Sequence, residues 1–383
     1  MALAYRSNRV RSSSGDDPKL PHDAVVEILK RLPVGSLLRF RCVCRSWRST
    51  IDDPDFVAHH LSHSALDASN GYLLCLDWDE GDDPVRYSLF SSESLTRPSM
   101  SQIEIPFAAS SKRFGFVGSC NGLICVREMS GDGYARSMYL WNLFTRKHRA
   151  VRRSSLDSKF RSIYNVHVAV GFGFDARSND YKILRILYFP DDINLVEVYS
   201  LSTDSWRSLE CEVPAFCAYS PSVFLNGNLH WLVSKNDDLW TEGWSGSIVL
   251  FDVASEVFDE MALSKEFLQV LSISKEVVLS ALNNLLAVCT VHGEAVGHPQ
   301  PHSVCSVWVM RDYGVPESWT KLYSFEACGQ VTGFDGFMRN GELLMLIDDD
   351  EGVSWNPITG QFTILPLSRQ SDLVTIIESL VSP

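Results

Sequence analysis

The residues best suited to chemistry lie in the stretch RFRCVCRSWR, which begins at Arg39. It places Cys42 and Cys44 among four arginines, just before Trp47. Thiols and cations this close together suit a zinc site, a redox pair, a nucleic-acid patch, or a helix face that a partner protein contacts. No further cysteines or histidines follow closely at zinc-ligand spacing, and thiols two residues apart on a helix point in different directions. A nucleic-acid patch or a helix face therefore remains.

The charge of the chain decides between these two. The net charge of the 383 residues is −13, which is unsuited to nucleic-acid binding. Residues 1–66 contain ten Lys and Arg against seven Asp and Glu, whereas the remainder contains 24 against 40. The two parts are therefore expected to have different roles, and the arginine-rich stretch is interpreted as one face of a helix.

Composition also indicates the cellular compartment in which the protein is expected. No apolar run reaches the ~18 residues of a membrane helix, and residues 1–18 lack the apolar core of a signal peptide. The ten cysteines occur mostly singly, inside apolar runs such as LLCL, which is typical of free thiols in a reducing compartment. We therefore expect a cytoplasmic or nuclear protein that contacts no membrane, with a disordered tail at 1–18.

Residues 19–62 have the start and stop signals of short helices. Pro21 opens the first helix and Pro33 ends it. In the next run, apolar residues recur at intervals of three and four and so share one helical face. They are Leu37, Phe40, Cys44, Trp47 and Ile51. A third helix is expected after Pro54. Three helices this short bury little apolar surface alone, so a partner should cover part of this face, with Cys42 packed inward on the first helix.

After Leu66 the apolar pattern changes to a period of two, which is typical of β-strands. Six Asn-centred turns, each before an apolar strand, recur through this region. They are Asn70-Gly71, Asn121-Gly122, Asn179-Asp180, Asn226-Gly227, Asn283-Asn284 and Asn340-Gly341. A second hairpin follows each turn in phase, so every unit holds four strands in ~50 residues. The repetition predicts a six-bladed β-propeller, with a pair of β-sandwiches as the alternative.

One strand is missing from the first unit and one is left over at the other end. The residues before Asn70 read as helix and linker, whereas Leu373–Val381 forms an unassigned strand. We predict that this strand pairs into the first unit and closes the ring. The expected protein is an α+β multidomain chain with a helical domain at 19–62, a linker at 63–70 and the propeller at 71–383.

The helical region resembles the F-box motif in the form found in plants. The matching residues are Leu20-Pro21, Ile28-Leu29, Leu32-Pro33, Leu37-Leu38, Val43-Cys44, Trp47, Pro54 and Phe56. The β region resembles the plant F-box-associated domain, which is related to kelch repeats. GSCNGLICV, LWNLFTRKHR and GFGFDARSNDYKILRI are among the segments that carry this second resemblance. Together the two resemblances cover almost the whole chain after residue 18.

The resemblance implies a function. F-box proteins are substrate receptors of SCF-type cullin–RING ubiquitin ligases: the F-box binds a Skp-type adaptor, and through it a cullin, while the C-terminal domain binds a target protein. The adaptor contacts implied here are Leu20, Pro21, Ile28, Leu32, Pro33, Leu37, Leu38, Val43, Cys44 and Trp47. The arginines would form a rim that attracts an acidic partner. An F-box scaffold acting outside the ligase, and a propeller enzyme, remain alternatives.

The phase of the repeat also predicts where a target binds. The long segments after the second strand of each unit must lie on one face of the ring, opposite the Asn turns. Variable loops on a rigid scaffold favour binding, so this long-loop face is the predicted recognition surface. Trp240 and Trp244 are its most conspicuous aromatics, and they either anchor a target or pack onto the fourth blade. The loops are acidic, which suits a basic target or simply keeps them solvated.

Other candidate sites are weaker. His59 and His63 have helical spacing without a third ligand, and three further histidines share the loop at 292–303. GFGF at 171–174 lacks the third glycine of a dinucleotide site. No phosphate-binding loop and no nucleophile motif occurs. The sequence therefore predicts no metal, no cofactor and no catalysis, and a propeller hydrolase would need carboxylates at its central channel.

Overall fold

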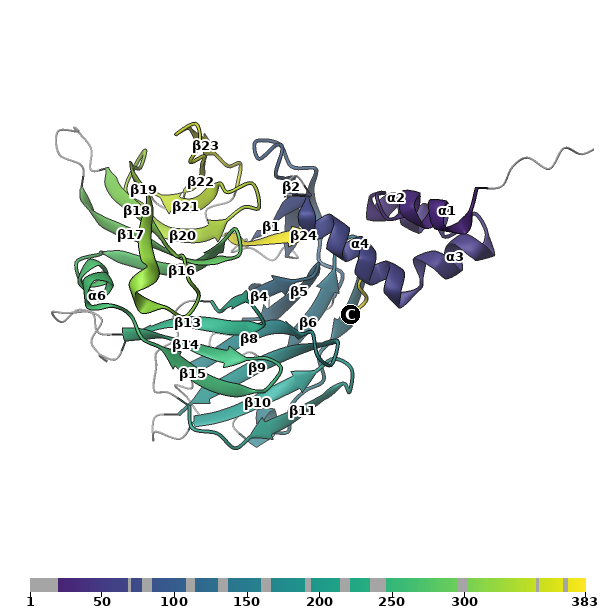
Figure 1. Ribbon diagram of the computed structural model, residues 1–383, viewed down its shortest axis with the longest axis horizontal. Helices are drawn as coiled ribbons and strands as arrows, with labels where there is room; N and C mark the ends of the chain where they lie inside the picture. Colours follow the sequence, from purple (N-terminus) through teal and green to yellow (C-terminus); the bar gives the residue numbers. More distant parts are fainter. Residues whose placement is uncertain are drawn as a thin grey trace, which may run out of the picture.

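The computed structural model describes residues 20–67, 70–77, 85–107, 114–129, 137–159, 167–189, 194–213, 221–234, 246–294, 302–348, 351–367 and 371–383. In these ranges, four helices at the N-terminal side precede six four-stranded sheets arranged around a ring (Figure 1). The predicted six-bladed β-propeller is confirmed. The tail expected at 1–18 lies outside the described residues.

Each sheet is one blade, numbered here in chain order. Blade one contains β24 (Ser371–Ile377), β1 (Gly71–Asp77), β2 (Arg86–Ser91) and β3 (Met100–Glu104). Blade two contains β4 (Phe114–Cys120), β5 (Leu123–Glu128), β6 (Met138–Asn142) and β7 (Lys147–Ala150). Blade three contains β8 (His167–Asp175), β9 (Asp180–Tyr188), β10 (Asn194–Ser200) and β11 (Ser205–Leu209).

The remaining blades follow the same plan. Blade four contains β12 (Val223–Leu225), β13 (Asn228–Ser234), β14 (Gly246–Asp252) and β15 (Val257–Met261). Blade five contains β16 (Glu276–Leu282), β17 (Leu285–Glu294), β18 (Ser303–Met310) and β19 (Trp319–Glu326). Blade six contains β20 (Val331–Phe337), β21 (Leu343–Ile347), β22 (Glu351–Trp355) and β23 (Phe362–Ile364). Between strands lie α5 (Leu156–Lys159), α6 (Lys265–Ser272) and the short 3₁₀ helix η1 (Pro316–Ser318).

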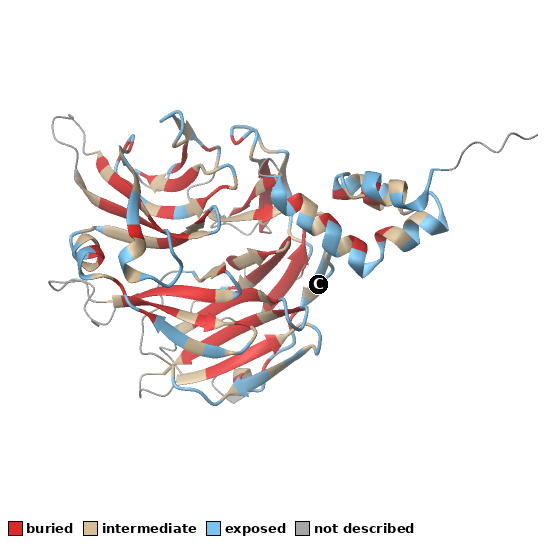
Figure 2. Ribbon diagram, viewed as in Figure 1, coloured by how far each residue is buried: buried red, intermediate tan, exposed pale blue. Residues whose placement is uncertain are grey.

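The first strand of each blade lines the centre of the ring. These strands contact one another in sequence, from β24 through β4, β8, β12, β16 and β20 and back to β24. The core lies between neighbouring blades rather than at one central point, and buried residues run along the middle of the strands (Figure 2). This arrangement leaves no long sheet edge exposed at the ring's centre.

The tight turns that follow the first strands need left-handed backbone. Asn121 and Asn226 have φ angles of 53° and 51°, and each is followed by a glycine at 80°. Two successive positive φ angles define the type I′ hairpin that Asn-Gly favours, as predicted. Asn70-Gly71 is different, because β1 begins at Gly71 directly after the helical region and no hairpin forms there.

The strand that closes the ring is the one the sequence predicts. β24 pairs antiparallel with β1, with Gly71 opposite Ile377 and Asp77 opposite Ser371. The paired strand ends at Ile377, earlier than the expected end at Val381, because the chain then leaves the sheet. Ile376 is 2% exposed and packs in the core between blades one and two.

The helical unit (residues 20–66) has four helices where three were expected. They are α1 (His22–Leu29), α2 (Val34–Phe40), α3 (Arg45–Ile51) and α4 (Pro54–Leu66). The expected second helix is interrupted because Cys44 is extended, with φ −154° and ψ 164°. Its Sγ accepts a hydrogen bond from the Trp47 backbone N–H (3.4 Å) and so caps a new helix. α4 continues to Leu66, through the first part of the linker expected at 63–70.

Candidate functional site

The helical unit sits on the side of the ring that carries the Asn turns. α4 lies against the ring, and α1 and α3 lie farther out (Figure 1). A groove of about 910 Å³ separates α4 from blades two and three, and its lining includes Asn121 and Asn179. The strand ends that lead into the long loops therefore lie on the side of the ring away from the helical unit.

The helical unit has a small core of its own. Leu29, Leu37, Ile51 and Phe56 are buried together, and Val25, Val26, Leu32, Phe40 and Leu380 pack against them. Leu380 follows β24, so a residue from the C-terminal region completes the core of the helical unit. Such a small core is consistent with the expectation that the unit alone buries little apolar surface.

Several apolar residues of the helical unit are left exposed. Leu20 is 63% exposed, Ile28 on α1 is 51% exposed, and Val43 in the turn between α2 and α3 is 63% exposed. Pro21 and Pro33, which precede α1 and α2, are exposed too. Exposed apolar groups this numerous on so small a unit are typical of a protein-binding surface.

The structure separates the predicted partner contacts into two kinds. Leu20, Pro21, Ile28, Pro33, Val43 and Cys44 are exposed, and Leu32, Leu38 and Trp47 are half-buried. Leu37 is fully buried in the core of the unit, so its prediction as a direct surface contact is wrong. Trp47 packs against the ring of Phe40, with the two centroids 5.3 Å apart. Substitution of Leu37 therefore tests folding of the unit, not contact with a partner.

Cys42 does not pack inward as expected. Its side chain is exposed, and its thiol donates a weak hydrogen bond to the Leu38 carbonyl oxygen, with Sγ and O 3.8 Å apart. The reason is the break between α2 and α3, which puts Cys42 in a turn. The nine cysteines within the described ranges are all free thiols.

The arginines divide into paired and unpaired groups. Arg41 and Arg48 both interact with Asp52, at 2.8 Å from Nη2 of Arg41 and 3.7 Å from Nε of Arg48. Among the described residues, Arg39 and Arg45 have no acidic partner, although Arg39 donates to the Gly35 carbonyl oxygen. The predicted rim thus retains two guanidinium charges available to an acidic partner.

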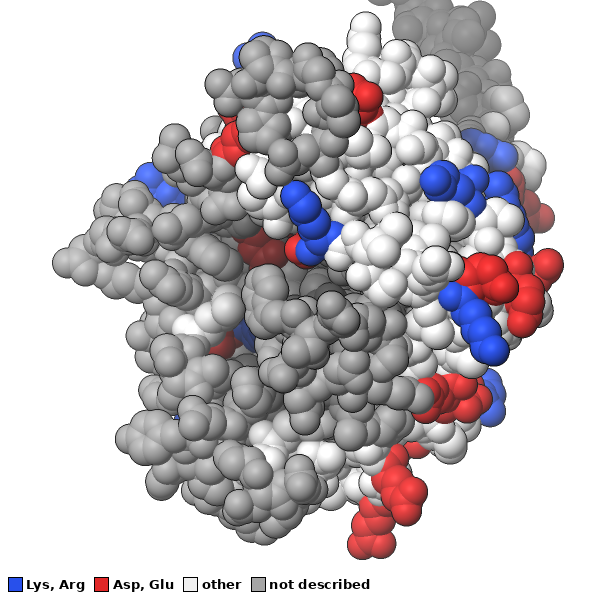
Figure 3. All heavy atoms as spheres, turned by 90° about the vertical axis from the view of Figure 1, so that its left-hand side faces the viewer, with Lys and Arg blue, Asp and Glu red and all other residues white. Residues whose placement is uncertain are grey.

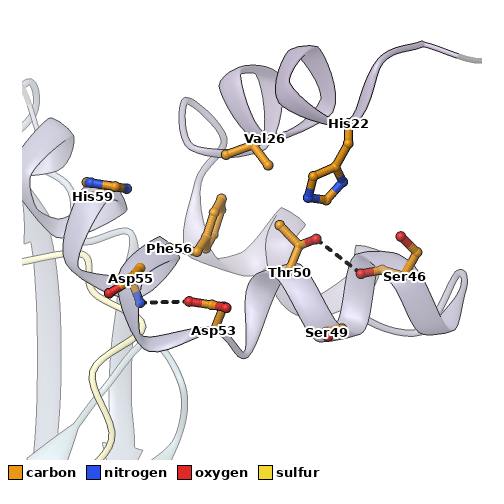
Figure 4. Close-up of a pocket in the computed structure, with 9 residues that line it drawn as sticks. All are labelled: His22, Val26, Ser46, Ser49, Thr50, Asp53, Asp55, Phe56 and His59. Atoms are coloured by element: carbon orange, nitrogen blue, oxygen red, sulfur yellow. Dashed lines mark hydrogen bonds between the residues drawn. The ribbon is translucent and has the colours of Figure 1, made fainter.

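A polar pocket of about 490 Å³ lies between α1, α3 and α4 (Figure 4). His22 points toward Thr50 from above, while Phe56 and His59 lie farther along the pocket (Figure 4). The Thr50 hydroxyl donates to the Ser46 carbonyl oxygen (3.1 Å), and Asp53 accepts from the Asp55 backbone N–H (2.8 Å). These polar groups stabilise helix ends and are not arranged as a nucleophile with its base.

The histidines of α4 do not form a metal site. His60 is buried, and its Nε2 donates to the Leu32 carbonyl oxygen (3.0 Å), which ties α4 to the loop before α2. Burial lowers the pKa of His60. Within the described ranges, no group of three or more His, Cys, Asp or Glu side chains is placed to hold a metal ion.

The predicted target surface is only partly described. Trp240 and Trp244 lie outside the described residues, as does most of the acidic loop sequence. Figure 3 shows the side of the ring turned away from the helical unit, where the described acidic and basic side chains are interspersed around the border. Asp348, which directly follows β21, accepts a hydrogen bond from the Gln330 backbone N–H (2.8 Å). No helix in the described ranges is long and apolar enough to cross a bilayer.

Two carboxylates lie on the strands that line the central channel. Asp335 on β20 remains accessible to solvent from the channel, yet the surrounding strands desolvate its carboxylate, and this desolvation, followed by the charge of Asp372 on β24, raises its pKa to about 7. Burial raises the pKa of Asp372 to about 6, although its carboxylate accepts from the Phe116 backbone N–H (2.6 Å). Two carboxylates without an adjacent nucleophile or a metal cluster among the described residues do not by themselves define a hydrolase site.

Sequence reasoning missed the residues that join the helical unit to the ring. Glu378, Leu380 and Asn142 are central to that junction, but none belongs to a chemical motif. The nearest signal is the segment ESLVSP, whose apolar residues continue beyond the strand that closes the ring.

Comparison with known proteins gives two family matches. A model of the F-box associated beta propeller domain matches residues 85–338, and an F-box domain model matches residues 18–59. Relatives in Arabidopsis thaliana include F-box protein At3g07870, 28% identical with 90% of this chain and 86% of that protein covered. F-box/kelch-repeat protein At3g23880 is 26% identical, with 95% and 96% covered. F-box protein CPR1 is 27% identical, with 84% and 76% covered.

Proposed function

Because this chain belongs to the plant F-box proteins that carry an F-box associated β-propeller domain, we propose that it is the substrate receptor of an SCF-type cullin–RING ubiquitin ligase. In this proposal the helical unit is the F-box that binds a Skp-type adaptor and, through it, a cullin. The propeller recruits a target protein for ubiquitination. The protein itself is non-catalytic and acts by bringing two proteins together.

The exposed apolar surface of the F-box is the observation that carries the proposal. Ile28 and Val43 are more than half exposed, although equally apolar neighbours such as Leu29 are buried. An interface core of aliphatic side chains with a charged rim is typical of stable protein complexes. The unpaired Arg39 and Arg45 favour an adaptor with an acidic surface.

The propeller supports the second half of the proposal. The described strand ends that lead into its long loops lie on the side away from the F-box, so a target bound there would not compete with the adaptor. The free thiols are compatible with the reducing cytosol or nucleus, where we place the protein.

The proposal is tested by co-purification of the full chain with a Skp-type adaptor and a cullin. The double variant Ile28→Asp/Val43→Asp places charge on two exposed positions and should abolish adaptor capture while the circular dichroism of the propeller is unchanged. Ile358→Asp is the matched control, because Ile358 is 88% exposed but lies on blade six, far along the chain from the F-box. Adaptor capture by the double variant at the wild-type level would refute the assignment, and adaptor capture without cullin would favour a scaffold outside the ligase.

A further inference from the structure

The residues that follow β24 connect the two parts of the molecule. We define residues 378–383 as the strap, which leaves blade one at Ile377 and passes between the ring and the helical unit (Figure 1). Its members contact both parts: Leu380 packs with the core of the F-box, whereas Val381 packs with the core between blades two and three. One short segment therefore contributes to two hydrophobic cores.

Glu378 bridges the F-box and blade one with a single carboxylate. Its Oε2 accepts from the Val34 backbone N–H at the start of α2 (2.8 Å), and its Oε1 accepts from the Tyr72 hydroxyl on β1 (3.0 Å). Burial and the nearby Glu378 charge raise the pKa of Tyr72 above its usual range, so the hydroxyl keeps its proton. Hydrogen bonds to an ionised carboxylate are stronger than neutral ones.

Asn142 at the end of β6 fixes the strap to blade two. Its Nδ2 donates to the carbonyl oxygens of Ser379 (2.9 Å) and Val381 (2.7 Å). Ser379 is fully buried, and its side chain approaches the turn glycine Gly122 so closely that a Cβ there would lie 2.3 Å from it. The strap is thus held at successive residues and cannot shift along the ring without breaking contacts on both sides.

A second attachment lies at the C-terminal end of α4. Arg339 of blade six donates from Nη2 to the Ala65 carbonyl oxygen, and its side chain packs where a Cβ on Gly71 would be. The F-box is therefore anchored near Ala65 by one blade and near Val34 by the strap. Two anchors at different elements restrict rotation in a way that one flexible linker does not.

We propose that the strap is a conformational device that sets the orientation of the F-box on the ring, with the Glu378 bridge and the Leu380 anchor as its working parts. The strap directly follows β24, the strand that closes the propeller, so the orientation is fixed only in a chain whose ring is complete. The benefit of a fixed orientation rests on the proposed function, since it would hold a bound target at a set position relative to the adaptor. The contacts of the strap with the F-box and the ring do not depend on that function.

The test uses the full chain and the variant Glu378→Ala/Leu380→Ala. The matched control is Ser382→Ala, which alters an exposed side chain of the same strap whose hydroxyl only accepts from Lys147 Nζ (3.3 Å). Hydrogen–deuterium exchange of a peptide covering residues 31–40 reports on the Val34 amide. Small-angle X-ray scattering reports on the placement of the F-box.

We expect about tenfold faster exchange in residues 31–40 of the double variant, because a charge-assisted hydrogen bond and an apolar anchor are lost together. The maximum dimension from scattering should increase, while exchange in β4 to β6 and all properties of Ser382→Ala stay at wild-type values. Wild-type exchange and scattering in the double variant would overturn the proposal.

If the double variant fails to fold, Glu378→Leu keeps a side chain of similar size and removes both acceptor oxygens, and unchanged exchange at Val34 in it overturns the proposal. Adaptor capture is measured on the same samples. Absence of capture by the wild type contradicts the proposed function alone, whereas the exchange and scattering results judge the strap alone.

Discussion

Replacing Asn142 by alanine should destabilise the protein far more than replacing the equivalent asparagine of another blade. Asn142 is fully buried and uses its whole amide: Nδ2 serves the two strap carbonyls, and Oδ1 accepts from the backbone N–H groups of Phe144 and Thr145, both at 3.0 Å. Asn356 in blade six has the same turn role, with Oδ1 accepting from Ile358 (3.0 Å) and Thr359 (3.1 Å). Its Nδ2, however, donates to a side chain, Glu342, and not to the strap.

The magnitude follows from the groups left without partners. A buried polar group that loses its hydrogen bond costs about 1–3 kcal/mol. Asn142→Ala leaves the carbonyl oxygens of Ser379 and Val381 and the backbone N–H groups of Phe144 and Thr145 without their hydrogen-bond partner. Water can reach the two N–H groups of the turn more easily than the two carbonyls of the strap. We expect a loss of about 3–5 kcal/mol in the free energy of unfolding, and about 1–2 kcal/mol for Asn356→Ala, whose turn is largely exposed.

The assay is urea unfolding followed by circular dichroism and tryptophan fluorescence, with thermal unfolding in parallel. A third chain, ending at Ile377, lacks the strap, and in it Asn142→Ala should cost no more than Asn356→Ala. Equal losses for the two asparagine variants in the full chain would refute the reasoning, because the strap carbonyls would then contribute nothing. A full-sized loss in the chain ending at Ile377 would refute it as well.

Three other changes test separate parts of the structure. Ile376→Ala removes a side chain from β24 that is 2% exposed, and urea unfolding should show a loss of about 2–5 kcal/mol, with a loss below about 1 kcal/mol contradicting the role of β24 in the core. Asp335→Asn should raise the melting temperature at pH 8 and leave it nearly unchanged at pH 4. The pKa of Asp335 is raised from 3.8 to about 7, so the folded state binds the proton more tightly and loses stability as the pH rises between these values; equal effects at both pH values would contradict this. Leu37→Ala should make the F-box sensitive to protease while the propeller resists, since about 2–5 kcal/mol is lost from its small core, and an F-box as resistant as the wild type would show that Leu37 is dispensable there.

The features that the sequence predicts correctly are those fixed by local chemistry. Asn121-Gly122 and Asn226-Gly227 mark hairpins because adjacent left-handed residues suit few other pairs. The spacing of the six Asn-centred turns then gives the number of blades. The closing strand follows by counting, since one unit lacks a strand and the last residues supply one.

The features that the sequence does not reveal depend on distant contacts. Helical periodicity places Cys44 on a continuous helix and cannot show that its backbone is extended. Periodicity also cannot show that Leu37 is buried whereas Ile28 is exposed, because a hydrophobic core and a partner interface both contain apolar side chains. The Glu378 bridge joins positions 306 residues apart in the chain, and no local pattern marks it.

The pairing of β24 with β1 also determines the order in which the molecule can be made. Each of blades two to six is a meander of consecutive strands, so it can form soon after its own residues leave the ribosome. Blade one must wait for residues 371–377, and until then β1 presents an unpaired, largely apolar edge, the kind of edge that templates aggregation. The F-box is synthesised before the propeller, but its core is complete only after Leu380 has been synthesised. Chaperone dependence should therefore be greatest in the interval between translation of β1 and translation of β24. A chain truncated anywhere in that interval would expose both the unpaired edge of β1 and the incomplete core of the F-box.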